Sequence, residues 1–467
     1  MKEFLTSATK DIRFWLAFFF LVRLCGITNP PLDGNHHWRQ VLTASIARNF
    51  YELEPGILYP HIDYAFGEHH GLIASEFPLF SWLISAVSRI VGYDHWYGRL
   101  INLIVSTVGL WFFYRVLKLF FSERHAFYST FFLTISVWFA FARKVMPDTF
   151  SMSLMIIGFY YAVLYVREGK WWQVFLFFLL ASTGGLCKLP VAFALVFPGI
   201  FVLDAKLGWQ RRLVLLATCA ASALVICWWY FVWIPELISR GGHSLYFIKS
   251  LGEGFSELLQ HKGELVRRFL FDNTKSYLLT AVAIAGCFML LRADKRWRIA
   301  LLASLPLILF FMLKTGEVFA LHNYYQIPLV PLTCVAAGFF IIKIPVKWGW
   351  IIGVVVLAES MINQIGDLSY PHRRAYKIQL EEIMNRFTSP NDMIAVVGDL
   401  NPVDLYFAHR RGWIVDQHEV TEERITDLRS KNCQLLLLPK RHFHVELGLK
   451  VLYEDENFAV YELKVEE

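Results

Sequence analysis

The sequence predicts a polytopic α-helical membrane protein with a small α/β domain at its C-terminal end. Of its 467 residues, 56% are hydrophobic and 16% are aromatic. The mean hydropathy of +0.43 is far above that of soluble chains of this length. Long apolar runs recur up to about residue 365, and a mixed, charged composition follows them. These observations indicate many membrane spans followed by one soluble domain.

Eleven apolar runs approach the roughly 17 to 25 residues that are needed to cross a bilayer. We place them near residues 12–28, 96–118, 125–142, 149–166, 171–187, 190–204, 212–234, 276–291, 298–314, 326–343 and 348–365. The sixth run is short for a span. We therefore expect about eleven transmembrane helices.

Lysine and arginine predict the orientation of these spans, because cytoplasmic loops carry an excess of both. With the N-terminus inside, every cytoplasmic segment is basic, from Lys2 at the start to Lys206 in a later loop. An odd number of spans then places the C-terminal hundred residues outside, with segments 29–95 and 235–275. The first run lacks a small-residue cleavage pattern, so we expect an uncleaved anchor. We see no N-x-S/T sequon in the outward segments, which favours a bacterial inner membrane.

The first outer loop contains two stretches with helical periodicity that do not qualify as spans. "HHWRQVLTASIARNFYE" carries an apolar stripe at i, i+4 spacing, formed by Trp38, Leu42, Ile46 and Phe50. "FPLFSWLISAVSRIVGY", residues 77–93, carries serines and an arginine, and counting it as a span would break the charge rule. We predict two juxtamembrane helices lying along the membrane interface.

Residues 366–467 read as a separate extracytoplasmic α/β domain, following a membrane domain over residues 1–365. "MIAVVGD", "CQLLLLP" and "FAVYEL" are typical of short buried strands, and "RRAYKIQLEEIMNRF" is typical of an amphipathic helix. The net charge of +6 comes from basic loops between apolar runs, so nucleic acid is not an expected partner.

Polar side chains gather on the outer face of this predicted topology. They are Asp33, His36, His37, Arg39, Glu76, Arg143, Lys144, Asp148, Lys188, His322, Tyr324 and Tyr325. A charged side chain at the centre of a membrane helix costs roughly 2.5 to 3.5 kcal/mol, and less near its edge. Such groups therefore need partners or a function, and we expect them to share one pocket.

Structural alternatives exist for the residues nearest the first run. Asp33 could cap the helix that begins near residue 35, which is compatible with catalysis. His36 and His37 could be interfacial, or could bind a metal with Asp33 or Asp148, although no familiar zinc spacing is present. Glu76 could only pair with a nearby cation.

The later residues have structural alternatives as well. Lys188 could extend its ammonium group to the lipid headgroups. Arg143 and Lys144 could anchor the end of a span in the same way. His322 and the two tyrosines after it could belong to an interfacial aromatic belt.

Several short motifs together resemble a known superfamily. "LDGNHHWRQ", "SEFPLFSWL", "YGRLINL", "ARKVMPD", "LCKLP" and "LHNYYQIPL" occur in the order, and with the hydropathy, of the GT-C glycosyltransferases that use polyprenyl phosphate sugars. These include the protein O-mannosyltransferases and the aminoarabinose lipid A transferases. The resemblance covers about residues 12–345 and implies the GT-C fold.

The resemblance also implies roles for the acids. Asp33 matches the acid of the first outer loop, which contacts the acceptor and can act as a base, and Asp148 matches the acid of the second outer loop. Glu76 matches the acid of an E-K-P stretch, but Phe77 stands where that stretch has a phosphate-contacting lysine. Gly34 stands where the mannosyltransferases often have a second acid.

On the donor side, the resemblance places Lys188 near the donor phosphate. His322, Tyr324 and Tyr325 lie where related enzymes have late-loop residues at the same phosphate.

These residues predict an inverting transfer of one sugar from a polyprenyl phosphate donor to an exported lipid, glycan or protein acceptor. Asp33 would accept the proton of the acceptor hydroxyl. Cations and hydroxyls would stabilise the departing phosphate, from Lys188, Arg143, Lys144, His322 and Tyr325. We expect no metal and no cofactor, since the donor carries no diphosphate.

Other functions remain open at this stage. A transporter or flippase of lipid-linked sugars would also need many spans, but with polar groups near the bilayer midplane and matching halves. A polymerase of lipid-linked sugars or an oligosaccharyltransferase would follow a similar plan, the latter with a much larger outer domain. A scaffold that only displays the C-terminal domain is the non-enzymatic alternative.

Overall fold

The computed structural model describes residues 9–34, 36–65, 71–202, 207–245, 249–293, 295–399, 401–445 and 447–464. Lys2 and Lys206, used above for the orientation, lie outside these residues. Two compact units are present. The helical unit comprises Met1–Ile27, Arg99–Val232 and Tyr246–Leu368, and the sheet unit comprises Thr28–Gly98, Trp233–Leu245 and Ser369–Glu467. The domain boundary expected at residue 366 remains a prediction.

The helical unit is built from α-helices with a few tighter or wider turns. Its α-helices are α2 (Ile12–Leu24), α5 (Trp96–Phe120), α6 (Glu123–Ile135), α7 (Trp138–Phe141), α8 (Pro147–Glu168), α9 (Trp171–Cys187), α10 (Gly199–Val202), α11 (Trp209–Trp228), α13 (Leu251–Gln260), α14 (Lys262–Arg267), α15 (Tyr277–Ala293), α16 (Lys295–Thr315), α17 (Glu317–Leu321), α18 (Val330–Ile341) and α19 (Val346–Ile362). The 3-10 helices are η1 (Leu189–Val196), η4 (Asn323–Gln326) and η5 (Ile365–Leu368), and the π-helices are η2 (Trp229–Trp233) and η3 (Arg268–Asp272).

Each predicted run therefore contains helix, but two runs are irregular. The third is divided into α6 and α7 at Ser136, which has an extended backbone. The sixth forms η1 and the short α10 instead of one long α-helix. Pro198, which lies between η1 and α10, explains the break, because proline lacks the N–H that an α-helix interior requires. Segment 235–275 also contains helices that the sequence analysis did not identify.

Four helices among the described residues are long and apolar enough to cross a membrane. They are α5, α8, the continuous helix Trp209–Ser239, and Trp297–Thr315 within α16. Two bent pairs, Lys262–Asp272 with Tyr277–Ala293 and Val346–Ile362 with Ile365–Met384, raise the number to six if each pair is one span. Only 11% of the apolar window in α16 is buried within the protein, so this helix presents an apolar surface suited to lipid. The number eleven remains a prediction.

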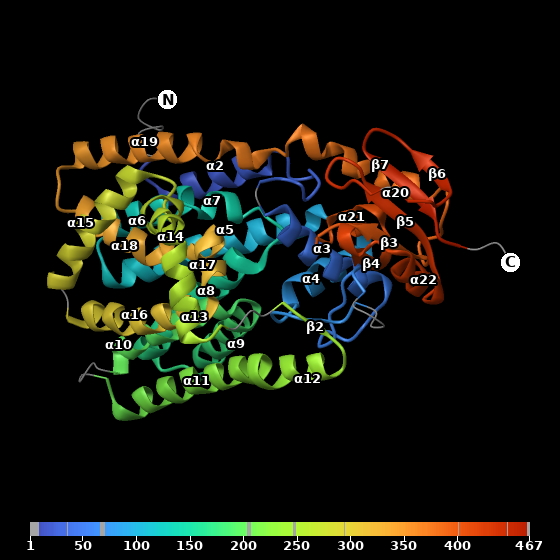
Figure 1. Cartoon of the computed structure of the whole chain (residues 1–467). Helices are drawn as coiled ribbons and strands as arrows, with labels where there is room; N and C mark the ends of the chain where they lie inside the picture. Colours follow the sequence, from blue (N-terminus) through green and yellow to red (C-terminus); the bar gives the residue numbers. More distant parts are fainter. Residues whose placement is uncertain are drawn as a thin grey trace. The chain divides into compact units, whose positions relative to one another are not determined.

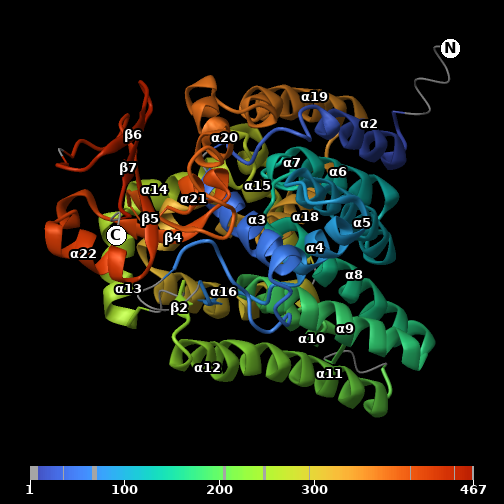
Figure 2. The ribbon, with the colours of Figure 1, turned by 90° about the vertical axis from the view of Figure 1, so that its right-hand side faces the viewer.

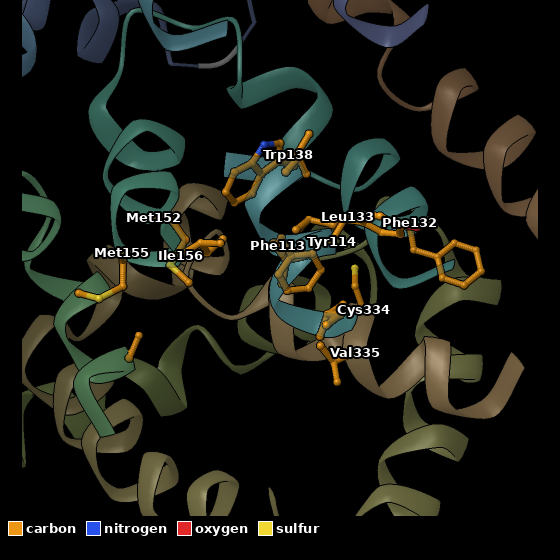
Figure 3. Close-up of a cluster of buried hydrophobic side chains, with 14 of the residues drawn as sticks. Phe113, Tyr114, Phe132, Leu133, Trp138, Met152, Met155, Ile156, Cys334 and Val335 are labelled. Carbon is orange, nitrogen blue, oxygen red and sulfur yellow. The ribbon is translucent and has the colours of Figure 1, made fainter. Parts of the chain in front are cut away.

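The core of the helical unit is aromatic and sulfur-rich. Figure 3 shows Phe113, Trp138, Met152 and Cys334 within one cluster of buried side chains. Helices α6, α15 and α18 pack side by side around part of this core (Figure 1). The unit therefore has a packed protein interior of its own and does not rely on lipid to bury these side chains.

The segment expected to be the first outer loop contains the two predicted helices, α3 (His37–Glu52) and α4 (Leu79–Val91). The apolar stripe of α3 is buried: Leu42, Ile46 and Phe50 pack with Ile62 and Ile73. The stripe thus packs against protein, whereas the sequence suggested a position along the membrane interface. The same unit contains α12 (Ile234–Ser239) and a short parallel pair of β1 (Ile73–Ala74) and β2 (His243–Ser244).

The C-terminal part of the sheet unit is a five-stranded sheet in the order β4-β3-β5-β7-β6. The strands are β3 (Met393–Val397), β4 (Arg411–Val415), β5 (Cys433–Pro439), β6 (Val451–Glu454) and β7 (Phe458–Glu462), accompanied by η6 (His372–Gln379), α20 (Leu380–Met384), α21 (Val403–Ala408), η7 (Gln417–Glu419) and α22 (Glu422–Ser430). Strands β4, β3 and β5 are parallel, and β7 is antiparallel to both β5 and β6. Figure 2 shows the sheet with α22 beside it.

The three strands predicted from the sequence are all present, whereas β4 and β6 were not predicted. Strands β3 and β5 are almost continuously buried, which is why their sequences are unbroken apolar runs. The edge strand β6 is exposed at both ends and carries only a weak pattern. The predicted helix over "RRAYKIQLEEIMNRF" is 3-10 in its first half (η6) and α-helical only in α20.

Candidate active site

Helices α8 and α9 form an antiparallel hairpin that positions two of the predicted site residues. Pro147 begins α8, and Asp148 lies in its first turn, where a negative charge complements the helix dipole. Gly169 ends α8 in the left-handed conformation, and α9 begins at Trp171. Lys188 is the residue at the other end of α9. A short turn therefore returns the chain so that Asp148 and Lys188 lie at the same end of the hairpin.

Glycine allows the two helices of this hairpin to approach closely. A Cβ atom on Gly184 would lie 2.8 Å from the carbonyl oxygen of Ser151, and one on Gly158 would lie 3.2 Å from the amide nitrogen of Ala181. Both contacts are with backbone atoms of the opposite helix. Small residues at such crossings are typical of helix pairs in membranes.

Lys188 lies at the centre of what we term the lysine cluster: Lys188, Asp148, Tyr324 and Tyr325. The ammonium nitrogen lies 3.0 Å from Asp148 Oδ1, with 9% and 2% of the two side chains exposed. It also lies 4.7 Å and 5.7 Å from the ring centroids of Tyr324 and Tyr325, which η4 supplies. Neither carboxylate oxygen of Asp148 accepts a hydrogen bond from a described residue. The cluster is thus a buried cation with one counter-charge and two aromatic faces.

His322 extends this cluster. Its ring centroid lies 5.2 Å from that of Tyr324, and its Nδ1 donates a hydrogen bond to the carbonyl oxygen of Val318 at 2.9 Å. Because a carbonyl can only accept, Nδ1 carries the proton. The other ring nitrogen, Nε2, can then accept a hydrogen bond in the neutral imidazole.

Arg143 and Lys144 contact a different set of residues. The guanidinium of Arg143 donates to the backbone carbonyls of Asp367 (3.0 Å) and Cys25 (2.7 Å). The ammonium of Lys144 lies 3.0 Å from Asp367 Oδ1. These contacts join three segments that are distant in sequence. They favour the structural alternative, in which the two cations hold the ends of helices together.

Asn102 was not identified from the sequence, although it lies in the motif "YGRLINL". Its side-chain amide donates to the carbonyls of Phe141 and Lys144 at 2.9 Å and of Met146 at 3.1 Å. Its Oδ1 accepts from Thr149 at 2.9 Å. Asn102 therefore holds the loop that leads into Asp148. The sequence did contain a signal for Asn102, namely a side-chain amide within an otherwise apolar helix, because such a group needs polar partners.

In the sheet unit, Asp33 is fully buried. Its Oδ1 accepts a hydrogen bond of 2.8 Å from the side-chain amide of Gln40, a residue that the sequence analysis did not identify. The N-cap residue of α3 is His36, whose side chain makes no capping hydrogen bond, so Asp33 is not itself the N-cap residue. Gln40, one turn into α3, instead orients the carboxylate.

The backbone around Asp33 explains the missing second acid. Gly34 has φ +61°, in the left-handed region that other residues rarely adopt. The guanidinium of Arg374 donates to the carbonyls of Leu32 (2.9 Å) and Gly34 (2.7 Å). A glutamate at position 34 would be strained, so this loop is shaped to present Asp33 alone.

The remaining sheet-unit residues are charged or polar groups with mixed roles. Arg39 and Glu76 form an ion pair, the pairing considered above for Glu76. Burial, followed by the nearby charges of Arg374 and Lys377, lowers the pKa of His37 to about 4, so it is neutral at neutral pH. Among the described residues, no group of three or more His, Cys, Asp or Glu side chains is arranged to hold a metal ion.

Comparisons with known proteins agree with this architecture. Residues 74–233 match the family model of dolichyl-phosphate-mannose-protein mannosyltransferases. No curated protein sequence matches the chain. The structure of ArnT from Cupriavidus metallidurans in the apo state is similar, with a TM-score of 0.66 and 13% identity over 96% of this chain and 98% of that chain.

Two complexes with lipid phosphates are similar as well. ArnT from Cupriavidus metallidurans bound to undecaprenyl phosphate has a TM-score of 0.62 and 12% identity, again over 96% of this chain and 98% of that chain. The archaeal oligosaccharyltransferase AglB from Archaeoglobus fulgidus, in complex with an inhibitory peptide and a dolichol-phosphate, has a TM-score of 0.53 and 11% identity over 91% and 69%. The fold expected from the motifs is confirmed by these similar structures. The match of residues 74–233 to the mannosyltransferase family model agrees with the expected class of enzyme, a glycosyltransferase.

Proposed function

We propose that this protein transfers a single sugar, with inversion, from a polyprenyl phosphate donor to an exported acceptor at the outer face of a bacterial inner membrane. The observation that carries the proposal is the lysine cluster. A cation that is buried at the end of a helical hairpin is costly to maintain, and it suits the phosphate of a lipid donor. The similar fold of ArnT in complex with undecaprenyl phosphate supports a lipid phosphate as the ligand.

Lys188 would stabilise the phosphate as it leaves. The ammonium group has three N–H donors and one close carboxylate partner, Asp148. As the bond between the anomeric carbon and the phosphate oxygen breaks, the electron pair stays on the phosphate, whose negative charge grows. A fixed, buried cation lowers the energy of that charge most in the transition state. Tyr324 and Tyr325 would donate hydrogen bonds to the same phosphate, and His322 would do so through Nε2 when its ring is protonated.

Asp33 would act on the acceptor. Its carboxylate would take the proton of an acceptor hydroxyl while that oxygen attacks the anomeric carbon from the side opposite the phosphate. The hydrogen bond from Gln40 keeps the carboxylate in one orientation. With an acceptor that is itself a phosphate, Asp33 would orient it instead of removing a proton. His36, His37, Arg39 and Glu76 belong to the same acceptor side in this proposal.

Arg143 and Lys144 would support the donor site through structure, because their charges are engaged by Asp367 and Cys25. The reaction as proposed uses no metal and no cofactor. In this proposal Lys188 stabilises the negative charge that grows on the phosphate, and Asp33 takes the proton that the acceptor hydroxyl loses.

The test uses the full chain in lipid nanodiscs with a radiolabelled polyprenyl phosphate sugar and a membrane extract as acceptor. Asp33→Asn should abolish transfer while lipid phosphate binding is retained. Lys188→Ala should raise the apparent donor KM by at least tenfold. The matched controls are Asp94→Asn and Lys170→Ala, which alter exposed side chains in the first outer loop and at the opposite end of α9, and both should behave as wild type.

Wild-type transfer by Asp33→Asn would disprove the assignment of the base, and an unchanged donor KM in Lys188→Ala would disprove the phosphate site. Movement of the labelled lipid across the membrane of sealed proteoliposomes, without any transfer of sugar, would favour a flippase instead.

A further inference from the structure

The sheet unit contains a cavity of about 560 Å³ whose lining includes, of the residues assigned to the proposed reaction, only His37. The described residues that line it all belong to that unit. They include His37 at the start of α3, Arg373 and Arg374 in η6, and Asp399, Asn401 and Phe443 in loops of the sheet. The volume lies within the range of small-molecule sites, which is roughly 300 to 1,000 Å³.

The cavity lies where parallel sheets commonly bind ligands. Gly398 and Asp399 directly follow β3, His442 and Phe443 follow β5, and Ile414 is close to the end of β4. Strand β3 is the middle one of the three parallel strands: β4, the next strand in the chain, lies on one side of β3, and β5 lies on its other side. The connections from β3 and from β5 therefore run in different directions across the sheet. Ligands of such sheets bind outside the carboxyl ends of the strands, where the connections diverge.

The charges of the cavity favour an anion. Lys377 is paired with Asp404, so these two lining groups neutralise each other. Arg373 is exposed and has no hydrogen-bond or ion-pair partner among the described residues. The guanidinium of Arg374 adds a second positive charge beside it, and Asp399 offsets one of these two charges. Arginine binds carboxylate and phosphate groups with two parallel hydrogen bonds.

The other lining groups favour a hydroxylated ring. The Nδ1 atom of His37 is buried without a hydrogen-bond partner among the described residues. The side chains of Asp399 and Asn401 are exposed at the same cavity, and Phe443 supplies an aromatic face. A buried ring nitrogen without a partner is costly, and a ligand hydroxyl would satisfy it.

We propose that this cavity binds an anionic sugar, a ring bearing a phosphate or a carboxylate, as part of the acceptor. Arg373 and Arg374 bind the anionic group, and His37, Asp399 and Asn401 bind hydroxyls. The assignment to the acceptor rests on the proposed function. Arg374 connects the cavity with the proposed base, because it lines the cavity and also donates to the backbone carbonyls on either side of Asp33. An acceptor bound here would be held beside the loop that carries the proposed base.

The test is isothermal titration calorimetry of the full chain in detergent with glucose 6-phosphate, glucuronic acid, methyl glucoside and inorganic phosphate. We expect at least one of the two anionic sugars to bind at least tenfold more tightly than methyl glucoside and than inorganic phosphate. Arg373→Ala should weaken that binding at least tenfold. Arg386→Ala is the matched control, since Arg386 is an exposed arginine paired with Glu382 in the same unit, and it should bind as wild type does.

Absence of binding by both anionic sugars, equal binding of methyl glucoside or inorganic phosphate, or no effect of Arg373→Ala would overturn the proposal. Binding of undecaprenyl phosphate is measured in parallel with wild type and Lys188→Ala. If only the anionic sugars fail to bind as expected, the proposed role of the cavity is rejected. If Lys188→Ala binds undecaprenyl phosphate as tightly as wild type, the proposed function is rejected, and the sugar-binding result for the cavity is unaffected.

Discussion

The lysine cluster allows a prediction that separates a structural from a functional role. In Lys188→Met the side chain keeps its length and loses its charge, so Asp148 is left as a buried carboxylate without a counter-charge. With 2% of the Asp148 side chain exposed, the protein offers it little water. Removing one member of a buried ion pair costs about 3–5 kcal/mol. We expect Lys188→Met to destabilise the protein by about that amount.

The double variant Asp148→Asn/Lys188→Met removes both charges. It should recover most of the lost stability, because no uncompensated charge remains. The contacts of the ammonium with Tyr324 and Tyr325 are still lost, at roughly 0.5–2 kcal/mol for a cation over an aromatic ring. The double variant should therefore remain about 1–2 kcal/mol less stable than wild type.

Stability is measured by SDS titration in mixed micelles with tryptophan fluorescence, and function by binding of undecaprenyl phosphate. We expect the double variant to be nearly as stable as wild type and yet to bind the lipid phosphate as poorly as Lys188→Met. Full lipid binding by the double variant would refute the phosphate-binding role. Unchanged stability in Lys188→Met would refute the view that Asp148 depends on this cation.

Two further predictions concern the sheet unit and the hairpin. The two ring nitrogens of His409 donate hydrogen bonds to Glu381 (2.8 Å) and Glu52 (2.7 Å), and these bonds raise the pKa of His409 to about 9. The stabilising effect of the charged ring is therefore complete below about pH 6.5, the usual histidine pKa, and is lost as the pH rises through 9. His409→Asn, which tolerates the left-handed backbone at φ +50°, should remove this part of the pH dependence of thermal unfolding, and an unchanged pH profile would contradict it. Gly184→Ala places a Cβ atom 2.8 Å from a backbone carbonyl oxygen. It should lower the free energy of unfolding by about 1–3 kcal/mol and reduce donor binding. The control is Gly208→Ala, whose Cβ atom would meet nothing within 4 Å, and it should alter neither the SDS titration nor donor binding.

Much of the helical framework was predictable, because membrane helices must satisfy their backbone internally and therefore appear as long apolar runs. The pairing of Asp148 and Lys188 was also accessible in part, since the short turn between α8 and α9 returns the chain to the same end. The irregular sixth run was less visible, because its apolar composition concealed the effect of Pro198. Strand β6 escaped detection because an edge strand is exposed and has little apolar pattern.

The residues that act on Asp33 could not be found by pattern alone. Arg374 is more than three hundred positions away in the chain, and its contacts with the carbonyls of Leu32 and Gly34 depend on how η6 packs in the sheet unit. The sequence left a capping role open for Asp33. The N-cap residue is instead His36 and the helix begins at His37, while the side-chain amide of Gln40 donates a hydrogen bond to the Asp33 carboxylate.

By itself, the sequence determined the class of the protein, the positions of most of its long apolar helices and the residue types available for chemistry, because hydropathy and charge are local properties of the chain. Only the tertiary structure decided which cations remain beside aromatic rings and which are engaged by Asp367 and Cys25. It also decided that a cavity forms at the strand ends beside η6. The partners of a side chain depend on packing between segments that are distant in the chain, and local sequence patterns do not predict that packing.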